Sequence, residues 1–213
     1  IWKFDGSMEK LPSETEIKKA IEKIGYQNIV LDKENSTIFL KKPGMKIGFG
    51  SIGKGYAAEK AREYLQNLGI AAGIIDASGD MTTLGNQPNG DLWKIGITNP
   101  FNRNKMADIL TLKNAAVTTS GDYEKFILID DIRYSHIINP KTGMPSTGLT
   151  GVTVIGPNAE TCNGFSTSIM VLGKEKGLAL INQQKDYAAL IITDNGSVIK
   201  SKKHRKIKKT LMN

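Results

Sequence analysis

A glycine-dense loop that leads into a helix constrains this chain more than any other segment. Four of the eight residues from 48 to 55 are glycine. Apolar residues then recur at helical spacing, and Gly69 is placed to end the helix. The apolar stripe consists of Ala57, Ala61, Tyr64, Leu65 and Leu68. Glycines let backbone N–H groups approach an anion, and a helix N-terminus and Lys54 add positive potential. The loop predicts a phosphate site; a plain glycine-rich turn is the alternative.

The same loop falls short of a nucleotide-binding P-loop. Residues 48–54 satisfy the first seven places of G-x-x-x-x-G-K-[ST], but Gly55 stands where a hydroxyl would bind magnesium. No strongly apolar strand precedes the loop, although that fold requires one. We therefore reject a P-loop NTPase and keep the phosphate interpretation.

Local signals indicate a mixed fold. Ser13 and Glu16 have capping-box spacing, so a helix begins there. Another helix begins at Asn158 and is interrupted at Gly173. Strands are expected at residues 29–31, 37–40, 72–77, 93–97, 109–112, 126–129, 134–138, 149–155, 188–193 and 197–200. We interpret residues 116–123 as a turn of small polar groups. Because strands and helices do not alternate regularly, we expect an α+β fold with largely antiparallel pairing.

Length and cysteine content exclude several classes of protein. The 213 residues fit one ordinary domain, and no run approaches the ~18 apolar residues of a membrane helix. One Cys excludes an internal disulfide, and together with two His it excludes a zinc finger. The chain begins at Ile1 without a basic, hydrophobic leader, so we expect a removed signal segment or a fragment.

The excess positive charge is concentrated near the C-terminus. The formal net charge is +8, and seven basic residues without an acid lie between residues 200 and 209. We therefore divide the chain into a domain over residues 1–199 and a basic tail over residues 200–213. A solvated terminus, which would leave His204 in solvent, and a surface for anionic partners both stay open. No aromatic residue interrupts the tail, so we expect no nucleic acid partner.

Three further side chains are chemical candidates. His136 follows a strand and precedes a turn, where an imidazole can transfer protons; a backbone-bonded strand histidine is the alternative. Asn163 and Thr167 are four residues apart on one helix face and offer oxygens to a hard cation. Hydroxyls that bond back to the helix are the alternative there. Cys162 falls on the apolar stripe of that helix, and we interpret it as packing.

Five segments, in this order, resemble the ApbE family, whose members are FAD:protein FMN transferases. They are GSIGKGYAA (50–58), DASGD (76–80), TSGDYE (119–124), SHIINPKTG (135–143), and ST (166–167) ahead of VLG (171–173). The resemblance implies a single compact α+β domain, T-fold-like, with FAD in a cleft. It also implies an enzyme that cleaves the FAD pyrophosphate with magnesium, passes FMN to a Thr or Ser hydroxyl of a target protein and releases AMP.

The resemblance also implies a role for each matching residue. Lys54 would neutralise the pyrophosphate, and His136 would act as general base on the acceptor hydroxyl. The Ser51 carbonyl, Asn163 and Thr167 would hold magnesium. Contacts to FAD are expected from Gly48, Ser51, Lys54, Asp80, Ser120 and Ile138.

The chain departs from the family pattern at three positions. Gly48, Asn139 and Asn163 each stand where the family usually has Asp. Asn163 keeps an oxygen ligand but removes a full charge, which should weaken magnesium binding. We also expect an absent N-terminal portion, roughly a third of the family's usual domain, that adds flavin contacts.

The family resemblance also implies where in the cell the protein is located. Two alternative functions stay open beside the transferase. Members are commonly exported, often as lipoproteins, so we expect a periplasmic or cell-envelope protein anchored to the membrane through the missing portion. An FAD pyrophosphatase that yields FMN and AMP is one alternative. A binding module that uses its basic tail is the other.

Overall fold

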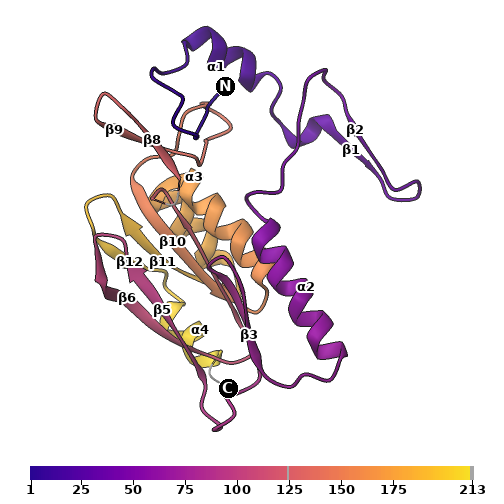
Figure 1. Cartoon of the computed structure of the whole chain (residues 1–213), viewed down its shortest axis with the longest axis vertical. Coiled ribbons are helices and arrows are strands. Elements are labelled where there is room, and N and C mark those ends of the chain that lie inside the picture. Colours follow the sequence, from indigo (N-terminus) through magenta and orange to yellow (C-terminus); the bar gives the residue numbers. More distant parts are fainter. Residues whose placement is uncertain (124, 212–213) are drawn as a thin grey trace. The chain divides into compact units, whose positions relative to one another are not determined.

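The chain folds into two units, each with its own antiparallel strand pairs (Figure 1). The computed structural model describes residues 1–123 and 125–211. The first unit comprises Ile1–Gly48 and Lys125–Ser146, and the second comprises the rest of the described chain. The mixed α+β class with antiparallel sheets agrees with the prediction.

The first unit follows its short-range sequence signals. Helix α1 (Glu14–Ile21) begins with the predicted capping box, in which Ser13 Oγ accepts the Glu16 N–H and Glu16 Oε2 accepts the Ser13 N–H. A 3-10 turn, η1 (Tyr26–Asn28), precedes the two predicted strands, β1 (Ile29–Asp32) and β2 (Thr37–Leu40), which pair as a hairpin.

A second hairpin of the first unit joins β8 (Phe126–Ile129) to β9 (Ile132–Ser135). Asp130 and Asp131 form its turn with φ of 50° and 60°, which short polar residues tolerate. The strand predicted over residues 134–138 is therefore wrong in extent. Strand β9 begins at Ile132 and ends at Ser135, because it pairs with β8 over these four residues.

The second unit is built on a six-stranded sheet in which every neighbouring pair is antiparallel. The strand order is β12-β11-β10-β7-β4-β3. The strands are β3 (Gly73–Ala77), β4 (Asp80–Leu84), β7 (Ala116–Gly121), β10 (Leu149–Gly156), β11 (Ala188–Thr193) and β12 (Val198–Lys200). The turn expected at residues 116–123 is wrong for residues 116–121, which form the central strand β7 with buried or half-buried, hydrogen-bonded hydroxyls; only residues 122 and 123 form a turn.

Helices cover one face of this sheet. Helix α3 (Ala159–Gln183) packs across β10, β7 and β11, and α2 (Gly53–Asn67) packs beside it over β3 and β4 (Figure 1). Gly173 breaks the α3 conformation at φ 77° and ψ 178°, as predicted. Among the described residues, no helix has both the length and the apolar content needed to cross a membrane.

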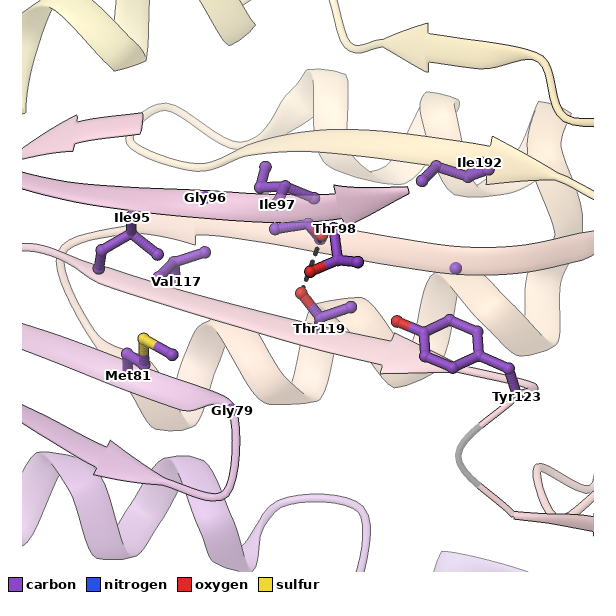
Figure 2. A pocket seen from close by; sticks show the side chains of 12 residues that line it. Gly79, Met81, Ile95, Gly96, Ile97, Thr98, Val117, Thr119, Tyr123 and Ile192 are labelled. Atoms are coloured by element: carbon purple, nitrogen blue, oxygen red, sulfur yellow. Dashed lines mark hydrogen bonds between the residues drawn. The ribbon is translucent and has the colours of Figure 1, made fainter. Parts of the chain in front are cut away.

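The opposite face carries the hairpin of β5 (Trp93–Asn99) and β6 (Asn102–Leu112), together with α4 (His204–Thr210). Alternation along β7 and β11 directs Val117, Leu190 and Ile192 to this side, where they form a core with Leu110 and Leu112. A cavity of about 190 Å³ lies on the same face, next to β5, and Figure 2 shows side chains that line it.

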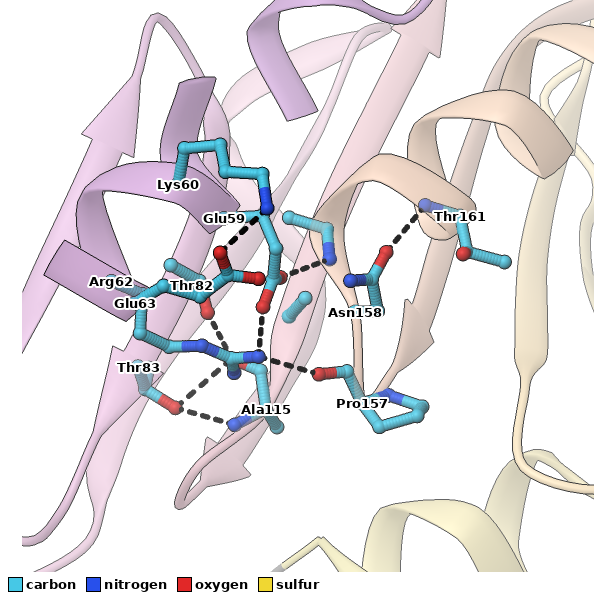
Figure 3. A network of polar contacts seen from close by, with 12 residues as sticks. Glu59, Lys60, Arg62, Glu63, Thr82, Thr83, Ala115, Pro157, Asn158 and Thr161 are labelled. Atoms are coloured by element: carbon cyan, nitrogen blue, oxygen red, sulfur yellow. Dashed lines mark hydrogen bonds and ion pairs between the residues drawn. The ribbon is translucent and has the colours of Figure 1, made fainter. Parts of the chain in front are cut away.

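Close contact between α2 and α3 depends on a glycine and a buried ion pair. A Cβ at Gly55 would lie 2.5 Å from the Ala159 carbonyl oxygen. Glu59 pairs with Arg62, and its Oε2 accepts the Ala159 N–H at 2.8 Å, at the start of α3 (Figure 3). Arg62 also donates to the Pro157 carbonyl at 3.1 Å.

This contact corrects the predicted apolar stripe of α2. Its buried residues are Gly55, Ala58 and Glu59, whereas Tyr64 and Leu68 are 65% and 61% exposed. The hydrophobic pattern failed because the two helices approach through small and paired polar residues.

Part of the C-terminal segment packs into the second unit's core, so its interpretation as a solvated terminus is wrong for the buried residues. Ile207 is buried in the same cluster as Leu110, and His204 is 3% exposed. His204 Nε2 lies 3.8 Å from Asp108 Oδ2, which Lys200 Nζ contacts at 2.7 Å. The many basic residues predict that the whole segment is exposed to solvent. The structure instead turns residues at helical spacing, such as His204 and Ile207, toward the core.

The α2–α3 contact predicts a stability difference between two glycines of one helix. Gly55→Ala should lower the free energy of unfolding by about 1–3 kcal/mol, because its Cβ meets backbone that cannot move aside. Gly53→Ala is the control, since its Cβ would lie 3.7 Å from Phe49 Cβ, an ordinary contact. Urea unfolding curves measure both; equal loss in the two variants would contradict this packing.

Burial of α4 makes a second prediction. Ile207→Ala should cost about 2–5 kcal/mol of unfolding free energy, because it leaves a cavity in the core. Arg205→Ala, two residues away at an exposed position, should stay within about 0.5 kcal/mol of the parent. Thermal and urea unfolding of the full chain test this; an unaffected Ile207→Ala variant would mean that the helix does not pack.

Candidate functional site

Lys54 lies in the first turn of α2, at the positive end of the helix dipole. Its Nζ donates to the Ser78 carbonyl at 3.3 Å and lies 3.9 Å from Asp80 Oδ2. The lysine side chain remains 35% exposed. A cation and a helix N-terminus therefore share one accessible place, which suits a phosphate-bearing ligand.

Asp80 is the fixed partner of this lysine. Its side chain is fully buried, and its Oδ1 accepts the Thr119 N–H at 3.3 Å. A buried carboxylate needs such partners, because removing its charge from water is costly. The structure thus gives Asp80 a role in positioning Lys54; its predicted contact with FAD stays a prediction.

Three predicted site residues of the second unit meet through their oxygens. Thr167 Oγ1 donates to the Ser51 carbonyl at 3.3 Å, and Ser120 Oγ lies 3.1 Å from Thr167 Oγ1. They come from the glycine loop, from α3 and from the end of β7, which are far apart in the sequence. The structure thus brings the loop into contact with residue 167; the magnesium site predicted for these residues stays a prediction.

Asn163 lies one turn before Thr167 on α3 and is 3% exposed. Its Oδ1 accepts the Gly55 N–H at 3.3 Å, which ties it to the start of α2. An amide oxygen has two lone pairs, so one remains for a cation.

The donor chemistry at these residues fits magnesium, which prefers hard oxygen ligands. The Ser51 carbonyl, the Asn163 amide and the Thr167 hydroxyl are all neutral. Among residues 1–123 and 125–211, no group of three His, Cys, Asp or Glu could hold a metal ion. The set therefore fits magnesium as the partner of an anionic ligand, whose phosphate oxygens supply the missing charge.

Three other predicted residues belong to the first unit. His136 Nδ1 lies 2.9 Å from the Lys125 carbonyl, and the Phe4 ring meets the imidazole edge-on at 6.4 Å. A carbonyl only accepts, so in the neutral imidazole Nδ1 carries the proton and the lone pair is on Nε2. Ile138 bridges to Pro145, and Gly48 ends the segment before the glycine loop.

A chain of hydroxyls was missed by sequence reasoning. Ser166 Oγ lies 2.9 Å from Ser120 Oγ and 3.5 Å from Thr118 Oγ1, and it donates to the Asn163 carbonyl at 3.0 Å. The only signal in the sequence was the two-residue spacing of the hydroxyls at positions 118 and 120, which places both on the side of the strand that faces α3. These bonds hold Ser120 against Thr167.

Cys162 has the packing role that its position predicts. Its side chain is fully buried, and burial raises the pKa of the thiol well above its usual value. A neutral, buried thiol is a poor nucleophile, so Cys162 has no place in the chemistry.

Known proteins similar to this chain carry related descriptions. A Klebsiella pneumoniae protein named FAD:protein FMN transferase is 31% identical over 207 residues, which make up 96% of this chain and 64% of that protein. A Haemophilus influenzae protein of the same name is 31% identical over 209 residues, with 94% and 60% covered. The chain thus spans less than two thirds of these relatives.

Solved structures that are similar to this chain also belong to ApbE proteins. The ApbE protein of Thermotoga maritima matches with a TM-score of 0.86 and 33% identity, over 93% of this chain and 65% of that one. The flavinyl transferase ApbE of Pseudomonas stutzeri matches with a TM-score of 0.82 and 30% identity, over 97% and 64%. The model of the ApbE family matches residues 1–191 of this chain. The ordered motifs, the antiparallel α+β fold and these matches together show that the chain belongs to the ApbE family.

Proposed function

We propose that this protein transfers FMN from FAD to a Thr or Ser hydroxyl of a target protein and releases AMP. One observation carries the proposal: Lys54 stands at a helix N-terminus, held by the Ser78 carbonyl and the buried Asp80. A pyrophosphate is the ligand that such a place suits. Membership of the ApbE family supports FAD as its source.

Residues of the second unit bind and orient the diphosphate. Lys54 and the positive end of the α2 dipole attract its oxygens, and Asp80 keeps the ammonium in place. Ser51, Asn163 and Thr167 would hold magnesium. When bound, magnesium supplies positive charge that stabilises the phosphoryl oxygens during transfer.

His136 moves the proton in this proposal. The acceptor oxygen bonds to the phosphorus of the FMN half, the bond from that phosphorus to the bridging oxygen breaks, and AMP leaves with that oxygen. The acceptor proton goes to His136 Nε2, whose lone pair is available because Nδ1 bonds to the Lys125 carbonyl.

The transfer reaction can be tested directly. The protein is incubated with FAD, magnesium and a Thr-containing target, and covalent flavin on the target is detected by in-gel fluorescence. His136→Ala should lower transfer by about 10²–10⁴-fold, the usual contribution of a general base, with FAD affinity unchanged.

Tyr134→Phe is the control, two residues away in the same segment. Unchanged transfer in His136→Ala would reject the histidine as base. FMN and AMP without labelled target would indicate hydrolysis, and FAD that neither binds nor reacts would reject both activities.

Magnesium binding gives an independent prediction that needs no turnover. Asn163→Asp should tighten magnesium binding in the presence of ADP by about tenfold, equivalent to ~1.4 kcal/mol, because it adds charge and still accepts the Gly55 N–H. Asn158→Asp adds the same charge to α3 at its N-cap, where Asn158 accepts the Thr161 N–H at 2.8 Å, and should change nothing. Titration calorimetry measures both; equal affinities would remove Asn163 from the metal site.

A further inference from the structure

Two aromatic side chains beside His136 have no role in the reaction described above. Trp2 and Phe4 are far from the histidine in sequence but belong to the same unit. The Phe4 ring lies 6.4 Å from the imidazole, with the two planes at 82°, and the Trp2 ring stacks on Phe4 at 6.3 Å and 15°. Both separations are within the ~4.5–7 Å over which aromatic rings attract each other. The imidazole therefore ends a row of three rings.

Trp2 is fixed to the rest of the first unit by a hydrogen bond. Its Nε1–H donates to the Gly143 carbonyl at 2.7 Å. The Gly143 N–H in turn donates to the Asn139 carbonyl at 2.8 Å, which closes a turn. A Cβ at Gly143 would lie 2.7 Å from Ile17 Cγ2, so this turn also packs closely against α1. The row of rings thus begins at a turn that α1 and backbone hydrogen bonds hold in place.

The Lys125 carbonyl holds the histidine by a different contact. It accepts the His136 backbone N–H at 3.0 Å and lies 2.9 Å from Nδ1 of the same residue. The orientation of an imidazole depends on two torsions, χ1 and χ2. One hydrogen bond at Nδ1 leaves them free to change together, so a second contact is needed to fix both. The Phe4 ring provides one.

His136 needs this second contact because its side chain is only half-buried. Exposed side chains change rotamer within picoseconds to nanoseconds. A general base must be within hydrogen-bond reach of the proton that it removes. Every rotamer that takes Nε2 elsewhere would therefore lower the rate, even if FAD and the acceptor were correctly bound.

We propose that Phe4 is a positioning residue for His136 and that Trp2 fixes Phe4. Together they hold the imidazole in the orientation in which Nδ1 donates to the Lys125 carbonyl and Nε2 keeps its lone pair for the acceptor proton. In this role neither ring exchanges a proton. The inference rests on the proposed function, in which His136 is the base.

Nitrogen NMR of the full chain at alkaline pH tests the positioning without turnover. In the parent, the shifts should show a neutral His136 with its proton on Nδ1. Phe4→Leu keeps an apolar side chain but removes the ring, and it should move the Nδ1 and Nε2 shifts toward each other as two tautomers average. The chain has two histidines, and His204, in the other unit, is the internal reference whose shifts should not move.

Flavin transfer measures the consequence for the reaction. Phe4→Leu should lower kcat about tenfold with the KM for FAD unchanged, because the base is misplaced while the diphosphate contacts stay intact. Phe4→Tyr keeps the ring and should transfer as the parent does. Phe39→Leu, the same substitution at a 64% exposed position on β2, should alter neither the shifts nor the transfer rate.

Trp2→Phe covers the case in which Phe4→Leu does not fold. It removes the donor to Gly143 but keeps a ring, so it should change the shifts and kcat in the same direction and by less. Unfolding curves establish that each variant is folded.

Unchanged nitrogen shifts in folded Phe4→Leu would overturn the proposal, and so would a Phe4→Tyr variant as impaired as Phe4→Leu. If transfer by the parent is intact in that case, the positioning role alone is rejected. Altered His136 shifts in Phe4→Leu beside unchanged transfer in His136→Ala would support the positioning and reject the histidine as base. If the parent shows no transfer, the shifts alone decide the positioning.

Discussion

The approach of α2 to α3 is the contact on which the candidate site depends. Gly55 permits it by leaving room for the Ala159 carbonyl, and Glu59 reinforces it by accepting the Ala159 N–H and pairing with Arg62. Lys54 immediately precedes Gly55, and Asn163 accepts the Gly55 N–H. The groups proposed to bind phosphate and metal are thus fixed by the same few atoms, so a shift of one helix would move both.

Strand β7 distributes polar groups to both sides of the sheet. Thr118 and Ser120 join the hydroxyl chain under α3, while Thr119 faces the cavity and its N–H binds Asp80. Buried hydroxyls are tolerated there because each has a hydrogen-bond partner. Because adjacent residues serve opposite faces, a one-residue shift in the register of β7 would disrupt both at once.

Signals that act over a few residues were predictable from the sequence. The Ser13–Glu16 capping box and the break at Gly173 both depend on local backbone chemistry. Strand β7 and the buried face of α2 were not predictable, because threonine hydroxyls and Glu59 are buried only through partners distant in the sequence. Burial of His204 likewise depends on β6, where Asp108 lies.

The same distinction applies to the site. Ordered motifs identified Lys54, Ser51 and Thr167, and the structure brings the last two together. What sequence could not show is why Asn163 is compatible with the proposed metal site. Asn163 Oδ1 accepts the Gly55 N–H, and an Asp carboxylate could accept the same N–H. The contact between α2 and α3 therefore does not require a negative charge at this position. A neutral donor set binds magnesium weakly by itself, which makes metal binding depend on the diphosphate. In the proposed reaction, magnesium and FAD would therefore bind together, each supplying the charge that the other lacks.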